Sequence, residues 1–317
     1  MEDDAFINLD DKVVEVDQVT SILQMVWRIT SQILKLVICC CSAGASVFLI
    51  YIISKFNKLR RSQNIFVLHY AIAYSIDMLV LPLLVLINDF TIGSWSGSIR
   101  WELMCLLYVI NGSSYILVFV FGATIGIYWY IETVKTTWFQ NLTNFKIYFI
   151  VAIYLICIIK FLIFSVECFF ETISTSTILI VTYSTVLVVI IIINIAVKRV
   201  ELNQDQLKSK YLLTISTYIT CSYLPLLASS FLLNFDVPDP VYYVLNFTYL
   251  LTECFAFSGI IVVTYLLGEN NKYFKTAYNR VFKRSVKSYD GSMLNDDSEE
   301  AEEVEDQVSE SVNTGVA

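Results

Sequence analysis

Seven long apolar blocks constrain the fold of this chain more than any other feature of its sequence. The hydrocarbon core of a bilayer is about 30 Å thick, so a helix needs about 20 mostly apolar residues to cross it. Each block meets that length, and only 16% of the 317 residues are charged, against about a quarter in soluble chains. The loops are short and no internal repeat is evident. The pattern predicts an all-α membrane protein with one bundle of seven spans, at residues 34–54, 64–88, 102–131, 146–167, 175–197, 211–234 and 241–267.

Most basic residues fall at one end of the predicted bundle. Sixteen of the 21 lysines and arginines lie in or beside the loops after the first, third and fifth blocks, or after the seventh. Cytoplasmic loops of membrane proteins carry such an excess. We therefore expect a multi-pass protein of the plasma membrane, with its N-terminus outside the cell and its C-terminus in the cytoplasm.

The two ends of the chain differ from the bundle. Residues 1–30 are expected to form an extracellular acidic segment, and the first 17 carry seven acids and one lysine. That charge does not fit the basic start of a cleavable signal peptide. Residues 288–317 are expected to form a disordered acidic tail, because ten acids and no base occur from residue 289 onward.

Two of the eight cysteines lie outside the apolar interior of the predicted spans. Cys105 is placed at the outer end of the third span, and Cys168 in the short outer loop after the fourth. Both face the oxidising side of the membrane, where a disulfide is permitted. Such a bond ties the loop to the third span, and two unrelated free thiols are the alternative.

Several motifs, taken in order, resemble those of rhodopsin-like (class A) G-protein-coupled receptors. The stretch "KLRRSQNIFVLHYAIAY" (58–74) resembles their first inner loop and second span. "CSYLP" (221–225) resembles their sixth-span CWxP, with Tyr223 in place of the tryptophan and Pro225 retained. The cysteine pair is also similar to theirs. "GENNKYFKTAYNRVF" (268–282) resembles their eighth helix, so the resemblance implies a short amphipathic cytoplasmic helix over 268–287.

Departures from the family pattern are equally clear. The second-span motif ends in Ala73-Tyr74, without the family's aspartate, and the seventh-span NPxxY is missing. The family's DRY triplet reads Tyr128-Trp129-Tyr130, and aromatic side chains cannot replace the charged fork of an arginine. The chain therefore couples to a G protein by unusual contacts, signals without ligand, or does not couple conventionally. Some vertebrate orphan receptors and herpesvirus-encoded receptors combine similar losses.

Pro225 and the altered triplet are the switch residues that the resemblance implies. A proline removes a backbone hydrogen bond, so the sixth span is expected to bend between Cys221 and Pro225. In the family, such a bend converts pocket occupancy into opening of the inner face. Tyr223 lies at the bend, and Tyr128, Trp129 and Tyr130 lie at the inner end of the third span.

Ionisable residues within apolar blocks suggest a ligand pocket in the outer half of the bundle. Charged groups at membrane depth are costly and are functional candidates by default. Internal pairing of these charges is the alternative, as is a lysine side chain that reaches outward to the membrane surface. The candidate pocket residues are Asp77, Lys160 and Glu253, with Gly112, Tyr115 and Tyr223.

Several other function classes find no support in the sequence. The lone histidine, His69, is interpreted as a packed residue, and no catalytic or metal-binding spacing occurs. We therefore expect no enzyme activity, no cofactor, no metal and no nucleic-acid partner. The seventh block has no lysine for a retinal Schiff base, and Gly112 stands where amine receptors carry an aspartate.

Two function hypotheses remain from the sequence. The first is an orphan class A-like receptor for a peptide, lipid or small molecule, with a heterotrimeric G protein or arrestin as the partner on its cytoplasmic face. The second is a seven-span non-signalling or decoy binding protein, or a ligand-gated channel. Insect-type channels of this size place the N-terminus inside, which the basic loops contradict.

Overall fold

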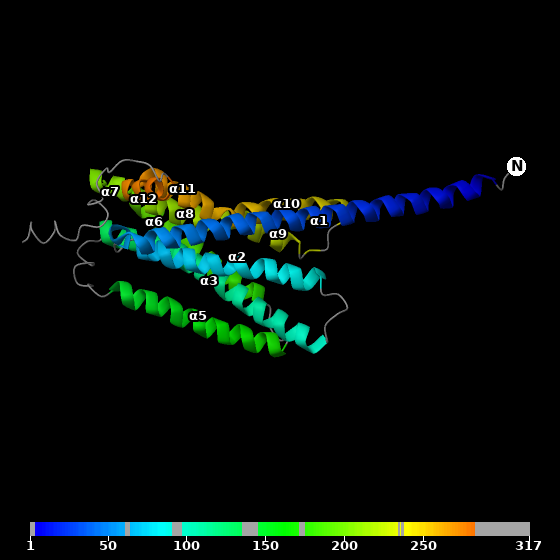
Figure 1. Ribbon diagram of the computed structural model, residues 1–317, viewed down its shortest axis with the longest axis horizontal. Coiled ribbons are helices and arrows are strands. Elements are labelled where there is room, and N and C mark those ends of the chain that lie inside the picture. The colour runs from blue at the N-terminus through cyan, green and yellow to red at the C-terminus, as the bar shows by residue number, and fades with distance from the viewer. Residues whose placement is uncertain are drawn as a thin grey trace, which may run out of the picture.

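The computed structural model describes residues 4–60, 64–90, 97–134, 145–170, 175–233, 235 and 238–282. The expected acidic tail over 288–317 lies outside these residues. Every regular element within them is helical (Figure 1). The main helices are α1 (Asp4–Lys55), α2 (Asn64–Phe90), α3 (Gly97–Val134), α5 (Phe145–Phe170), α6 (Thr175–Lys198), α7 (Gln204–Ser209), α8 (Tyr211–Ser222), α9 (Leu224–Leu232), α10 (Asp239–Phe257), α11 (Gly259–Asn270) and α12 (Lys272–Phe282).

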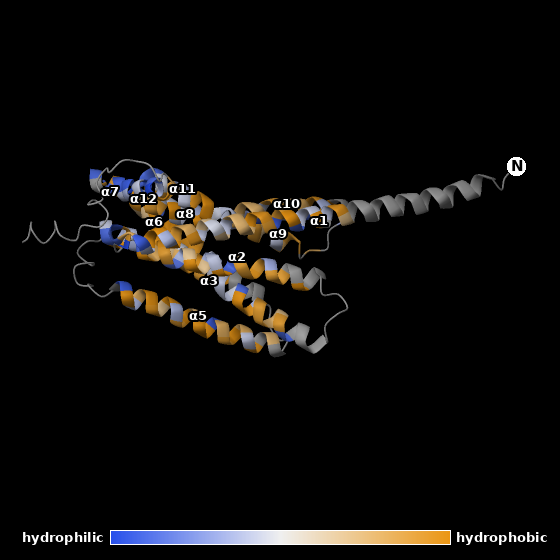
Figure 2. Cartoon of the chain, viewed as in Figure 1, coloured by the Kyte–Doolittle hydropathy of each residue, from blue (hydrophilic) through white to orange (hydrophobic). Residues whose placement is uncertain are grey.

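Within the described residues, seven helical segments are long and apolar enough to cross a membrane. This confirms the predicted all-α architecture with seven candidate spans. Figure 2 shows apolar residues along the bundle and hydrophilic residues gathered around α7 and α12. The segments are Met25–Lys55, Asn64–Leu84, Glu102–Val134, Lys146–Val166, Ile180–Lys198, Gln206–Leu232 and Val241–Asn270.

The bundle has two ends, which we name by their contents. The disulfide end contains Cys105 and the start of α10, and the α12 end contains α7 and α12 (Figure 1). The expected boundary at residue 30 is not a helix boundary, because α1 runs unbroken from Asp4 to Lys55. No glycine or proline interrupts the chain before residue 44, so the helix that spans the membrane continues back through the acidic segment.

Helix α3 is the centre of the bundle and packs against α2, α5, α6 and α8. Its crossing with α8 is close because two glycines face α8. A Cβ atom at Gly122 would lie 2.7 Å from Ile219, and one at Gly126 would lie 2.6 Å from the Ser216 hydroxyl. Small residues at helix crossings let two backbones approach closely inside membranes. The Ser216 hydroxyl also donates to the Gly122 carbonyl at 2.7 Å, which joins the two helices directly.

The sixth and seventh spans are each interrupted within the bundle. α8 ends at Ser222 and α9 begins at Leu224, with Pro225 in the first turn of α9. The interruption falls at Tyr223, between Cys221 and Pro225, where the sixth span is expected to bend. The seventh span breaks at Ser258, between α10 and α11, where no proline is present.

The α12 helix follows the seventh span directly. It occupies 272–282 among the described residues, so it begins four residues after the implied start at 268, and residues 283–287 lie outside the described part of the chain. Phe274 and Ala277 are fully buried, and the Tyr278 hydroxyl donates to the Thr264 carbonyl at 2.9 Å. The Tyr278 ring lies over Gly268, where a Cβ atom would come within 2.7 Å of it. These contacts fix α12 against the end of the bundle.

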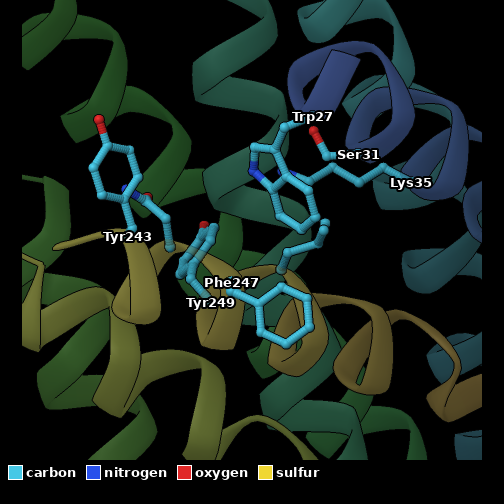
Figure 3. A pocket seen from close by; sticks show the side chains of 8 residues that line it. Trp27, Ser31, Lys35, Tyr243, Phe247 and Tyr249 are labelled. Carbon is cyan, nitrogen blue, oxygen red and sulfur yellow. The ribbon is translucent and has the colours of Figure 1, made fainter. Parts of the chain in front are cut away.

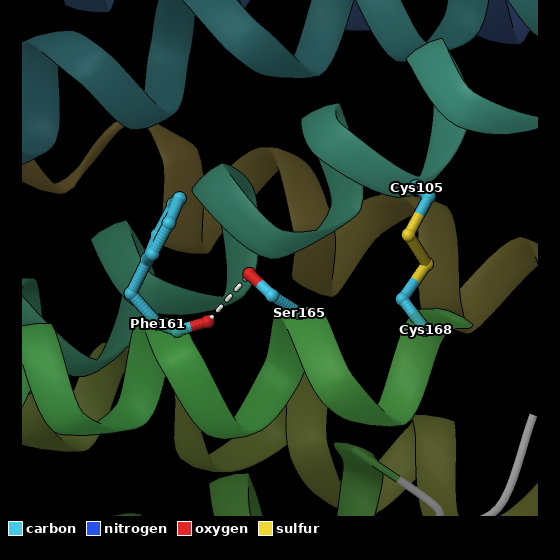
Figure 4. Close-up of a disulfide and its surroundings, with 4 residues drawn as sticks. All are labelled: Cys105, Phe161, Ser165 and Cys168. Atoms are coloured by element: carbon cyan, nitrogen blue, oxygen red, sulfur yellow. Dashed lines mark hydrogen bonds between the residues drawn. A yellow bond between two sulfur atoms is a disulfide. The ribbon is translucent and has the colours of Figure 1, made fainter. Parts of the chain in front are cut away.

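The predicted disulfide is present and joins Cys105 of α3 to Cys168 (Figure 4). The expected position of Cys168 in a loop was wrong, because Cys168 lies in the last turn of α5. The sequence from Val166 to Phe170 contains no helix breaker, so the helix continues past the cysteine. The bond therefore clamps one helix to another, with the two Cα atoms 5.8 Å apart.

Replacing both Cys105 and Cys168 by serine should destabilise the disulfide end. The bond closes a loop with a sequence separation of 63 residues, and a bridge of this kind typically contributes ~2–4 kcal/mol. We expect a lower melting temperature and less protein at the cell surface. The matched control is Cys40→Ser with Cys41→Ser, because these thiols are free and exposed on α1. Equal melting of the two double variants would contradict the assignment.

Candidate functional site

Three ionisable side chains come from α1, α2 and α10, and two of them, Asp77 and Glu253, are buried, whereas Lys35 is partly buried. The ammonium group of Lys35 is 2.5 Å from the carboxylate of Glu253, and the Glu253 side chain is only 8% exposed. Asp77 of α2 is buried and close enough to act electrostatically on Cys39 and Tyr115, as Glu253 also does. We call Lys35, Asp77 and Glu253 the ionisable cluster.

The alternative that these charges pair internally holds for Glu253, although with a different lysine. The sequence offered Lys160 only as an example of a lysine that could pair with a carboxylate, and Lys35 was not among the predicted site residues. The sequence could have pointed to Lys35, because it lies just inside the first apolar block at 34–54. The candidate first span in fact begins at Met25, so Lys35 lies well within it.

Asp77 differs from Glu253 because no lysine or arginine in the described part of the chain forms an ion pair with it. Neither of its carboxylate oxygens accepts a hydrogen bond from any side chain or backbone group that the structure describes. Burying such a group without a partner costs several kcal/mol if it is charged. Residues under this constraint inside a membrane span are functional candidates, so Asp77 remains a candidate for ligand binding or switching.

Tyr223 connects the break in the sixth span to this cluster. Its ring is fully buried and meets the rings of Tyr115 and Phe119 edge to face, with centroids 5.9 and 4.9 Å apart. Asp77 lies close enough to Tyr223 to act on it electrostatically. The structure thus brings four predicted residues together, namely Asp77, Tyr115, Tyr223 and Glu253.

Tyr74 stabilises the break in the seventh span. Its hydroxyl lies 2.8 Å from the Phe257 carbonyl and 3.0 Å from that of Ala256, and the Ser42 hydroxyl also donates to the Phe257 carbonyl. A helix break frees carbonyl groups that must find other donors inside a membrane. Tyr74 stands where the resembling family has an aspartate, so a neutral donor here holds the second, first and seventh spans together.

A pocket of about 520 Å³ opens between α1 and α10 toward the disulfide end (Figure 3). At one end, Lys35 borders both the pocket and Glu253, which links the pocket to the ionisable cluster. At the other end, the rings of Trp27 and Phe247 make contact with centroids 5.5 Å apart. The pocket is lined by Trp27, Ser31, Lys35, Tyr243, Asn246, Phe247, Tyr249 and Leu250.

Two predicted pocket residues lie elsewhere. Gly112 faces Phe164 of α5, where a Cβ atom would lie 3.1 Å from the ring. Lys160 is on α5, which packs against α3 and lies on the opposite side of the bundle from α1 and α10 (Figure 1). Helix rotation decides such placements, and residue type alone does not reveal it. His69 is packed as interpreted, stacked on Phe121 and hydrogen bonded to Tyr154.

The aromatic triplet lies at the α12 end of α3. Tyr128 packs against Phe66, with ring centroids 4.9 Å apart, and Tyr130 is partly buried in the core. The indole of Trp129 donates a hydrogen bond to the Ser209 hydroxyl at 2.9 Å. One turn further along α3, the Thr133 carbonyl accepts a bond from the Gln206 amide at 2.6 Å.

These two bonds join the third span to the start of the sixth, and we call them the polar latch. Gln206 also accepts a bond from the Asn203 backbone at 2.9 Å, which fixes its side chain at the start of α7. Sequence reasoning missed Gln206 and Ser209, although their place at the start of the sixth span, opposite the triplet, was a usable signal.

Comparison of the chain with protein-family models gave no match, and comparison with curated proteins gave none either. The resemblance to class A receptors therefore rests on the motifs quoted above.

Proposed function

We propose that this protein is a seven-span receptor of class A type in the plasma membrane, with its disulfide end outside the cell. Most of the described basic residues beside the spans lie at the α12 end, in the last turns of α1, α6, α7 and α12, which supports a cytoplasmic position for that end. Figure 2 shows hydrophilic residues gathered there. A ligand at the disulfide end would act on the ionisable cluster. The response would be read at the α12 end by a heterotrimeric G protein or an arrestin.

The observation that carries this proposal is the pair of helix breaks that meet one buried polar region. Tyr223 lies at the break in the sixth span, and the Phe257 carbonyl is held by Tyr74 at the break in the seventh. Pro225 and the Ser258-Gly259 pair weaken the helix at these two places, so we expect the two halves of each span to move separately. Hinged helices of this kind are two-state elements that a ligand biases from one side.

The polar latch supplies the restraint on the inactive state. Receptors of the resembling family use a charged arginine at this place, and Trp129 and Gln206 make neutral hydrogen bonds in its stead. Neutral bonds are weaker than charge-assisted ones by about a factor of two. The closed state is therefore held less tightly, which gives the proposed receptor a high basal activity.

Removing both latch bonds should raise basal signalling. At about 1 kcal/mol for each bond, the double variant Gln206→Ala with Ser209→Ala shifts the equilibrium toward the open state by roughly 20- to 30-fold. Second-messenger output should be measured without ligand, across the G-protein classes and at matched surface amount. An N-terminal tag on intact cells measures that amount and also tests the orientation. Gln204→Ala is the control, because Gln204 is exposed on the same helix.

Flat output from both wild type and latch variant in every G-protein class would favour the second hypothesis. In that case the protein is a non-signalling binding protein that keeps a receptor architecture. The observation that favours this second hypothesis is the absence of an arginine from the triplet Tyr128-Trp129-Tyr130.

A further inference from the structure

We infer that the pocket between α1 and α10 binds a neutral single-chain lipid, whose head group offers oxygen acceptors to Lys35. This inference deepens the proposed function, because such a lipid would be the activating ligand of the proposed receptor. Binding itself does not depend on signalling, so the two ideas fail separately.

The geometry defines a slot between two spans. One face of α1 is buried at Cys39, Ser42 and Ser46. Toward the disulfide end, the same face continues through Lys35, Ser31 and Trp27, which line the pocket. On α10, the face that is buried at Glu253 and Phe257 continues toward the disulfide end through Leu250, Asn246 and Tyr243, which also line the pocket. The two helices meet where Ser42 donates to the Phe257 carbonyl, and the slot lies between them beyond that contact.

The surroundings of the slot favour a ligand that comes from the bilayer. On both helices, apolar side chains at the same level are exposed, including Val26 and Ile29 of α1 and Val244 and Leu251 of α10. In a membrane these side chains face lipid. The slot itself is walled by Trp27, Phe247 and Leu250, and its volume of about 520 Å³ is within the usual range for small-molecule sites.

The charge of the slot decides the head group. The Lys35 ammonium carries three N–H donors, and its interactions in the described structure are the ion pair with Glu253 and the nearby Tyr249 ring. Two donors therefore stay available for a ligand. Since Glu253 already balances the charge of Lys35, a carboxylate or phosphate ligand would add an uncompensated negative charge in a low-dielectric site. Neutral hydroxyl or ester oxygens satisfy the donors without that penalty.

The head group has further polar neighbours. Asn246 and Tyr243 reach the pocket from α10, and both can donate or accept hydrogen bonds. A glycerol ester has several oxygens that match this set, and its acyl chain matches the aromatic wall formed by Trp27 and Phe247. Monoacylglycerol is therefore the probe of choice, with a fatty acid of the same chain as its anionic counterpart.

The test compares binding of radiolabelled 1-oleoylglycerol and oleate to the full chain in nanodiscs at pH 7.5. Wild type should bind 1-oleoylglycerol saturably and roughly tenfold or more tightly than oleate, since an unmatched charge is worth at least that factor. Glu253→Gln keeps an acceptor for Lys35 but removes the balancing charge. It should shift the preference toward oleate by a similar factor.

Two further variants distinguish a loss of lipid binding from a loss of folding. Lys35→Met with Glu253→Leu removes the donors and leaves no charge, so it should weaken 1-oleoylglycerol binding by roughly tenfold. Lys160→Met changes a lysine on the far helix α5 and should bind as wild type does. Equal or tighter binding of oleate to wild type would overturn the inference. So would a lack of saturable 1-oleoylglycerol binding, or the same lipid preference in Glu253→Gln as in wild type.

Discussion

Replacing Gly126 by leucine should prevent α3 and α8 from packing and remove most of the folded protein. A Cβ atom alone would lie 2.6 Å from the hydroxyl oxygen and 2.9 Å from the Cβ of Ser216, and 3.4 Å from Ile190. The rest of a leucine side chain has no space at this crossing. Overpacking in a well-packed core costs ~1–3 kcal/mol, and more when two backbones must separate.

The effect should also extend to the bond beside the glycine. Ser216 donates to the Gly122 carbonyl, and that bond breaks if α8 moves away. Thermal unfolding of the purified protein and its yield at the cell surface measure the outcome. Gly44→Leu is the matched control, because a Cβ atom at Gly44 meets nothing within 4 Å. Similar melting of the two glycine variants would show that α3 and α8 do not cross at Gly126.

The second large effect should come from breaking the ion pair of Lys35 and Glu253. Lys35→Met leaves the carboxylate of Glu253 buried with no counter-ion, and removal of one partner from a buried pair typically costs ~3–5 kcal/mol. The double variant Lys35→Met with Glu253→Leu removes both charges, and apolar replacements of that kind are often neutral or stabilising. We therefore expect the double variant to unfold at a higher temperature than Lys35→Met.

A double-mutant cycle isolates this interaction from the general effects of each substitution. The cycle consists of wild type, Lys35→Met, Glu253→Leu and the double variant, each measured by thermal unfolding in nanodiscs. Lys160→Met serves as a control for loss of a lysine from a span. Additive effects of the two single substitutions would mean that the two groups do not pair.

The number and approximate bounds of the spans followed from hydropathy, because a bilayer demands a minimum apolar length. The break at Tyr223 also followed, since Pro225 lacks the amide that a continuous helix needs. The break at Ser258 had a weaker sign, because Ser258-Gly259 is a pair that also weakens helices. The sequence could not show that Ser42 and Tyr74, from two other helices, donate to the Phe257 carbonyl beside it.

Side-chain partners were harder to predict than helices. Hydropathy does not fix the rotation of a span that is apolar on most sides, so it could not show that Lys35 meets Glu253. For the same reason it placed Gly112 and Lys160 near a pocket, whereas Gly112 packs on Phe164 and α5 lies far from α10. The latch was hidden because Gln206 and Ser209 are ordinary polar residues whose role depends on facing Trp129 and Thr133.

The central claim is that the third and sixth spans can separate at the α12 end and that the polar latch holds them together. Spin labels on Val134, at the end of α3, and on the exposed Leu207 of α7 report that separation directly. Unnatural amino acids can carry the labels, which leaves the cysteines unchanged.

The measurement is the distribution of label-to-label distances by pulsed electron resonance in nanodiscs, for wild type and for Gln206→Ala with Ser209→Ala. The account predicts a short main distance in wild type with a minor longer component, and a longer component that becomes the larger one in the latch variant. A single short distance that is identical in the two proteins would contradict it.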